Sequence, residues 1–213
     1  MSLSVRFLCG KINLTFSGGH CMKKWWQNTN RGVLLLLVVL FAVAIYLVCD
    51  AINIRKEKKT VKDLASQYAI ESSCMYSFPS GLDYWSWNGF DITDLIPAIH
   101  NQAEPLKHYF YDNETVQEQE TDKFVYFFRY CFDRQLCPVS ATKQITDIKF
   151  HEIYNGSASI TVYSKTTVEF LDAGGKKVVN EMDSDDTLSF LKINGEWKIV
   201  KADCSLNNYE GWF

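Results

Sequence analysis

At 213 residues, the chain has room for one ordinary domain together with a tail and an anchor. Its composition, 47% hydrophobic and 22% charged, is typical of a folded protein and excludes a disordered one. The formal net charge of −3 gives no basic excess, so a nucleic-acid partner is not expected. Aromatic residues make up 15% of the chain, which favours a well-filled core unless the rings cluster locally.

The N-terminal tail, residues 1–32, ends in a short basic leader. Residues 1–21 show no periodicity, whereas Met22 is followed by two lysines and two tryptophans, like the beginning of a bacterial signal anchor. We therefore expect residues 1–21 to be upstream sequence translated in error.

An apolar run follows, with no charged residue from Val33 to Cys49. It is long enough to predict a transmembrane helix over residues 33–52, and Trp25 and Trp26 precede it where an interfacial aromatic belt would lie. A cleaved signal peptide is the main alternative, but no small-residue cleavage site follows and the residues before Cys49 make a poor lipobox. An uncleaved signal anchor fits better.

Two signals disagree on the orientation of this helix. Counting cations alone puts the C-terminal side in the cytoplasm, because more lysines and arginines follow the run than precede it. The basic leader, and the even number of cysteines in the soluble part, argue for an oxidising compartment. We expect a single-pass membrane protein whose C-terminal domain is extracytoplasmic.

After a charged stalk at residues 53–60, residues 61–213 are predicted to form one domain that starts with helices. The first helix should run to about Ser72, and helical turns should return over residues 91–111. Pro97 and Pro105 should break these turns into short pieces unless each falls in the first turn of a helix. A further helix should end before Pro138, on the evidence of an apolar stripe that comprises Phe124, Phe127, Phe128, Cys131 and Phe132.

Beyond Pro138 the hydrophobic period changes to two, as in half-buried strands. Asn155-Gly156, Ala173-Gly174-Gly175 and Asn194-Gly195 separate the alternating runs and predict hairpin turns. The sequence therefore predicts an α+β domain in which helices pack on one face of a curved four-stranded antiparallel meander.

Helices followed by such a meander, with the hairpins TVEFLDAGGKKV and LKINGEWKIV, resemble the nuclear transport factor 2-like (cystatin-like cone) superfamily over roughly residues 60–206. This resemblance implies a sheet curled into a cone that either holds a ligand or is plugged by side chains. A basic tail, one membrane helix and one such domain are also similar in architecture to the bitopic assembly factors of type IV secretion and conjugation channels.

A local cluster of aromatic residues between two glycines provides the candidate binding surface. It contains Tyr84, Trp85, Trp87 and Phe90, and the C-terminal Trp212 and Phe213 raise the same question. Tyrosine and tryptophan are frequent binding anchors. The alternative, that these rings plug the open end of the cone as core, is slightly favoured, because apolar loop residues usually fold back onto a domain this small.

We expect no enzyme activity, cofactor or metal site. Enzymes of the resembled superfamily place an acid, histidine or tyrosine inside the cone, and the residues available for that role are Asp91, Asp94, His100, His108, His151 and Tyr163. Asp91 and Asp94 are better explained as helix caps, and His151 shares the wet strand face with Lys149. The cysteine spacing does not suit zinc.

Four cysteines of the domain are candidates for disulfides: Cys74, Cys131, Cys137 and Cys204. They allow three connectivities, one of which combines Cys131–Cys137 with Cys74–Cys204. The local Cys131–Cys137 bridge is the most plausible pair, and four buried thiols are the alternative.

The resulting hypothesis is a non-enzymatic binding or assembly module of the bacterial cell envelope, such as a component of a conjugation or type IV secretion channel. It would be anchored in the bilayer through residues 33–52 and would bind protein partners, a second copy of itself being one candidate. The alternative is a small-molecule-binding or isomerase-like cone tethered at the membrane surface.

Overall fold

The computed structural model describes residues 6–7, 10–11, 31–87, 91–111 and 113–204. The chain divides into two compact units, residues 1–53 and 54–213. Strands β1 (Arg6–Phe7) and β2 (Gly10–Lys11) form a two-residue antiparallel pair in the first unit. The origin of residues 1–21 and their place in the mature protein stay predictions.

Helix α2 (Arg31–Glu71) is continuous through the predicted span, the predicted stalk and the first helix of the domain. The sequence explains this continuity, because neither glycine nor proline occurs between Val33 and Glu71. Among the described residues, α2 is the one helix that is long and apolar enough to cross a membrane, and no part of its most apolar window is buried. This is the arrangement expected of a single N-terminal membrane helix.

Shorter helices follow α2. They are the 3₁₀ helices η1 (Ser72–Tyr76) and η2 (Glu104–Tyr109), and the α-helices α3 (Leu95–Ala103) and α4 (Asn113–Asp133). Pro97 lies in the first turn of α3 and Pro105 in the first turn of η2, where a missing backbone N–H costs no hydrogen bond. The two prolines are therefore accommodated in the first turns of helices and do not break them. Helix α4 ends before Pro138, as predicted.

The sheet is an antiparallel meander in the order β3-β4-β5-β6. Its strands are β3 (Leu136–Tyr154), β4 (Ser157–Asp172), β5 (Lys177–Ile193) and β6 (Glu196–Cys204). Asn155 and Asn194 have positive φ and each precedes a glycine with positive φ, which are the backbone angles that a tight Asn-Gly hairpin turn requires. The predicted four-stranded meander is confirmed.

Strand β3 begins two residues earlier than the position at which the period changes. Pro138 fits inside it because β3 is an edge strand and its register shifts between Pro138 and Ser140. A proline without a backbone N–H is tolerated at such a bulge on an edge.

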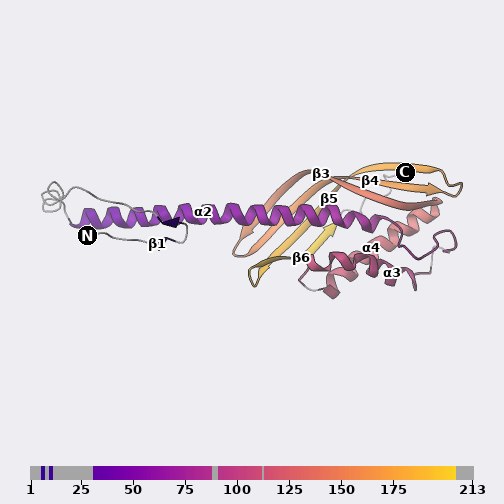
Figure 1. Ribbon diagram of the computed structural model, residues 1–213, viewed down its shortest axis with the longest axis horizontal. Coiled ribbons are helices and arrows are strands. Elements are labelled where there is room, and N and C mark those ends of the chain that lie inside the picture. Colours follow the sequence, from indigo (N-terminus) through magenta and orange to yellow (C-terminus); the bar gives the residue numbers. More distant parts are fainter. Residues whose placement is uncertain (1–5, 8–9, 12–30, 88–90, 112, 205–213) are drawn as a thin grey trace. The chain divides into compact units, whose positions relative to one another are not determined.

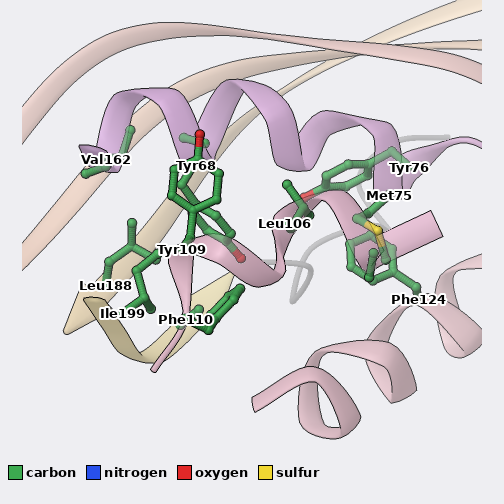
Figure 2. Packing of buried hydrophobic residues seen from close by; sticks show 14 of the residues in the cluster. Tyr68, Met75, Tyr76, Leu106, Tyr109, Phe110, Phe124, Val162, Leu188 and Ile199 are labelled. Carbon is green, nitrogen blue, oxygen red and sulfur yellow. The ribbon is translucent and has the colours of Figure 1, made fainter. Parts of the chain in front are cut away.

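The core lies between the helices and one face of the sheet (Figure 1). Figure 2 shows Tyr68 of α2 beside Tyr109 and Phe110, whose ring centroids lie 5.6 and 5.5 Å from that of Tyr68. Val162, Leu188 and Ile199 face these rings from three neighbouring strands and are fully buried. The α+β class with helices packed on a four-stranded meander is therefore confirmed.

Glu57 fastens the domain part of α2 to the β5–β6 hairpin. Its carboxylate accepts hydrogen bonds from Lys192 Nζ and from Trp197 Nε1, each at 2.5 Å. These two donors hold the pKa of Glu57 below its ordinary value, because they stabilise the ionised form.

This contact makes a pH-dependent contribution to stability. A carboxyl whose folded-state pKa is lowered stabilises the fold above its unfolded pKa near 4.5, and the contribution is lost as the pH falls through the folded-state value. We expect Glu57→Gln to flatten the fall in urea midpoint between pH 6 and pH 3, measured against the unchanged chain. Glu196→Gln, at a carboxylate 75% exposed, is the matched control and should leave the profile as it is. An identical profile for Glu57→Gln would contradict the assignment.

Candidate functional site

The predicted aromatic surface lies between η1 and α3, and most of its described rings point inward. Tyr84 is 3% exposed, and its hydroxyl donates to the Leu136 backbone oxygen at 2.8 Å. Phe78 packs edge to face on Tyr84, with ring centroids 4.8 Å apart. Trp87 is half-buried against Phe132 at 5.3 Å, and its Nε1 donates to the Asp91 backbone oxygen at 2.6 Å. Tyr84 and Trp87 therefore join this segment to α4 and β3.

Trp85 differs from these two residues because 44% of it is exposed. Its ring rests edge to face on Tyr84, with centroids 5.1 Å apart. Asp83 holds the turn, since its carboxylate accepts from the Trp85 backbone N–H at 3.1 Å and from the Ser86 hydroxyl. The hydrogen bond from Ser86 lowers the pKa of Asp83. Trp85 is thus a surface ring that rests on Tyr84. The other predicted residues of this surface, Phe90, Trp212 and Phe213, lie outside the described residues.

A hollow of about 250 Å³ adjoins Trp87, lined by Leu82, Asp83, Ser86, Trp87, Asp91, Asp94 and Leu95. Two of its carboxylates accept from the local backbone, Asp83 from the Trp85 N–H at 3.1 Å and Asp91 from the Thr93 N–H at 2.9 Å. Asp94 is the N-cap residue of α3, but its side chain makes no cap hydrogen bond, so the expectation that its carboxylate caps the helix is wrong. In the part of the chain that the structure describes, no group of three or more His, Cys, Asp or Glu side chains is arranged to hold a metal ion.

The described cysteines of the domain are free thiols. Cys131 and Cys137 are both buried, and burial raises the pKa of the Cys131 thiol, with a further contribution from the neighbouring Cys137. Burial likewise raises the pKa of Cys137, to about 11. Such thiols carry little thiolate at neutral pH and are poor nucleophiles. The bridge Cys131–Cys137 is not formed in this structure and stays a prediction for the oxidised protein. The bridge Cys74–Cys204 also stays a prediction, because the Cys204 side chain lies outside the described ones.

The candidate acid and base residues do not come together. Asp91, Asp94, His108 and His151 are exposed, and His100 is half-buried on α3. His151 Nε2 lies 2.7 Å from the Thr161 hydroxyl on the wet face of the sheet, and His108 Nδ1 lies 2.8 Å from the Pro105 backbone oxygen. Tyr163 is 36% exposed on the wet face. These positions show no shared centre.

Sequence reasoning missed a buried ion pair on the inner face of the sheet. Lys143 of β3 donates to Asp186 Oδ2 of β5 at 2.6 Å, and the two side chains are 1% and 0% exposed. The Tyr76 ring of η1 covers the ammonium group, with its centroid 5.3 Å from Lys143 Nζ. Asp186 Oδ1 is buried and accepts no hydrogen bond from any described group. Asp186 lies at every second position with Leu188 and Phe190 on the same strand, and this alternation could have indicated that it faces the core.

Three hydroxyl groups of β4 and β5 extend this ion pair into a polar band on the inner face of the sheet. Ser184 Oγ lies 2.9 Å from Ser164 Oγ and 2.8 Å from Thr166 Oγ1, and all three residues are buried. Val162 pairs with Asp186 in register and Thr166 with Lys143, so the lysine crosses β4 diagonally to reach the aspartate. One lysine, one aspartate and three hydroxyl groups thus form a hydrogen-bonded polar network inside an otherwise apolar core.

The wet face of the same strands carries a second hollow, of about 520 Å³. Its lining includes three exposed aspartates and one tyrosine: Asp147, Asp183, Asp185 and Tyr163. These carboxylates make the hollow acidic, whereas elsewhere the same wet face carries cations such as Lys165, which is paired with Glu181.

The fold and its surfaces define a class: an α+β domain with a curved antiparallel meander, carried on one apolar helix. No protein-family profile matches the chain, and no curated protein matches it. Solved structures with a similar arrangement include CagV, a VirB8 homolog of the type IV secretion system of Helicobacter pylori (9% identity, 67% of this chain and 96% of that chain, TM-score 0.40).

Two further solved structures are an NTF2-like protein involved in plasmid conjugation and the intermembrane space region of the chloroplast protein ARC6. The first is 13% identical over 67% of this chain and 49% of that chain, with a TM-score of 0.32. The second is 6% identical over 68% of this chain and 94% of that chain, with a TM-score of 0.34. At such identities and TM-scores these similarities carry nothing about function.

Proposed function

We propose that this protein is a membrane-anchored, non-enzymatic binding module of the bacterial cell envelope, whose domain lies outside the cytoplasm. One observation carries the proposal: the inner face of the sheet is filled by the domain's own rings, while Trp85 is exposed and rests on the buried Tyr84 ring. Phe127, Phe128, Phe170 and Phe190 are at most 1% exposed. A cone of this kind offers a partner its surface rather than its interior.

The proposal extends to a role in a conjugation or type IV secretion channel. The order of segments supports it, because a basic leader, one apolar helix and one α+β domain suit an assembly factor that contacts other membrane proteins. The domain is then held at the membrane surface by α2, and self-association is part of the same proposal.

A second candidate function, a small-molecule-binding or isomerase-like cone, is favoured by Asp186. Its Oδ1 is a buried acceptor without a donor among the described groups, which is how a site for a polar ligand looks before the ligand binds. Against it, Asp186 Oδ2 is already paired with Lys143. We therefore place the binding module first.

The two tryptophans provide the test. Trp85→Ala should change the free energy of unfolding by less than about 1 kcal/mol, because the ring is exposed. The same variant should no longer form the protein complex that a membrane-impermeant amine crosslinker traps in spheroplasts. Trp87→Ala is the matched control and should destabilise the domain by about 2–3 kcal/mol, since it empties space against Phe78, Tyr84 and Phe132.

Three results would contradict the proposal. A complex that survives Trp85→Ala would remove this ring as an anchor. Unfolding by Trp85→Ala would make it a core residue. Crosslinking that requires lysis of the spheroplasts would place the domain in the cytoplasm.

A further inference from the structure

The first domain turns of α2 carry a dense group of cations. Arg55, Lys56, Lys58, Lys59 and Lys62 are all exposed. Among the described residues, none of the ion pairs involves any of these five side chains. Lys58 alone has a partner of another kind, the Phe150 ring at 5.8 Å. The group is therefore a local excess of positive charge in a chain whose net charge is negative.

The packing of α2 on the domain sets which side of the helix these cations occupy. Glu57, Val61, Ala65 and Tyr68 face the domain, through the contacts of Glu57 and the burial of the other three. At 100° per residue, Arg55, Lys58, Lys59 and Lys62 fall on one arc of about 100°, away from the centre of that buried side. We call these four residues the basic stripe. Lys56 lies outside this arc.

The stripe begins close to the apolar segment of the same helix. Arg55 lies three residues after Ile52, the last residue of the predicted span, and Lys62 lies ten residues after it. Side chains on a helix point toward its N-terminus, which here is the end that leads into the span, so the lysines extend back toward the headgroups.

We propose that the basic stripe binds the phosphate groups of anionic phospholipids. This inference rests on the proposed membrane anchoring and adds lipid selectivity to it. Ammonium and guanidinium groups donate to phosphate oxygens, and each cation close to an anionic bilayer strengthens the association about fivefold. An acidic protein would fit the charge equally well, but the position next to the span and the direction of the side chains favour the lipid.

The test uses the full chain in vesicles of phosphatidylcholine, with and without phosphatidylglycerol. Lysines are acetylated with a water-soluble reagent, and the rate at each lysine is measured by peptide mass spectrometry. Phosphatidylglycerol should slow the acetylation of Lys58, Lys59 and Lys62 severalfold, and high salt should reverse this. Lys149 and Lys176, which are exposed and outside the ion pairs of the described residues, are internal controls and should react equally in both vesicles.

A matched pair of variants extends the test to lipid selectivity. Neutralising the stripe (Arg55→Gln, Lys58→Gln, Lys59→Gln, Lys62→Gln) should abolish the enrichment of phosphatidylglycerol over phosphatidylcholine in the purified protein. Neutralising Lys149, Lys176 and Lys201, all exposed residues of the sheet and its turns, should leave the enrichment unchanged.

The outcomes separate the inference from the proposal beneath it. Equal acetylation of the stripe in both vesicles, with the chain retained after alkaline carbonate washing, would overturn lipid binding alone. Release of the chain by carbonate would overturn the membrane anchor and this inference with it. Equal protection by inorganic phosphate in phosphatidylcholine vesicles would assign the stripe to free phosphate instead, and protection only after adding envelope proteins would assign it to an acidic partner.

Discussion

Replacing Lys143 by Met is expected to lower the free energy of unfolding by about 3–5 kcal/mol, because it leaves a buried carboxylate without its counter-ion. Lys143 Nζ lies 2.6 Å from Asp186 Oδ2, and neither side chain has more than 1% of its surface exposed. Asp186 Oδ1 already accepts no hydrogen bond from a described group, so the variant would leave both oxygens unsatisfied. Urea unfolding at neutral pH, followed by circular dichroism, measures the loss.

The double variant Lys143→Met, Asp186→Leu makes this prediction specific to the charge. Because both charges are removed together, it should recover most of the stability lost in the single variant. The exposed pair of Lys177 and Glu169 is the matched control, and Lys177→Met should cost less than about 1 kcal/mol. If the double variant were no more stable than Lys143→Met, the loss would come from packing and the buried pair would not be its cause.

Replacing Phe128 by Ala is expected to cost about 3–5 kcal/mol, through the cavity that it leaves in the core. Phe128 is fully buried on α4, with ring centroids 5.3 Å from Phe78 and 5.5 Å from Phe127. The ring therefore connects α4 with the segment that supports Trp85. The measurement is again the urea midpoint of the domain in the full chain.

Tyr126, two positions earlier on the same helix and 60% exposed, provides the control. Tyr126→Ala should change the free energy of unfolding by less than about 0.5 kcal/mol. A small effect of Phe128→Ala would mean that the cone tolerates empty space. That result would favour the ligand-binding alternative over a filled core.

The strands, turns and membrane helix of this fold could be predicted from the sequence because they depend on local patterns. Asn155-Gly156 and Asn194-Gly195 mark tight turns through their own backbone preferences, and both turns occur with positive φ at each central residue. The alternation around Ile160 and Val162 follows the side-chain period of a strand, whichever strand lies next to it. The apolar run from Val33 to Cys49 identifies the candidate membrane helix by composition alone.

The candidate site depended on contacts between distant parts of the chain. Tyr84 and Trp85 are adjacent and chemically similar, yet Tyr84 is buried because its hydroxyl reaches Leu136, 52 residues away, while Trp85 is left exposed. A cluster of aromatic residues in a turn-rich segment does not reveal which ring finds such a partner. Burial in that segment is therefore a tertiary property.

The sequence by itself determined the meander, its turns, the single apolar span and the presence of helices before the sheet, because helix period, strand period and turn preference act over a few residues. Only the tertiary structure decided that Lys143 meets Asp186, because three strands must first pair in the correct register to bring residues 43 positions apart together. The same holds for the basic stripe, whose side of α2 is set by the contacts of Glu57 with Lys192 and Trp197. Long-range pairing, not local pattern, decides which polar groups a fold buries and which it presents.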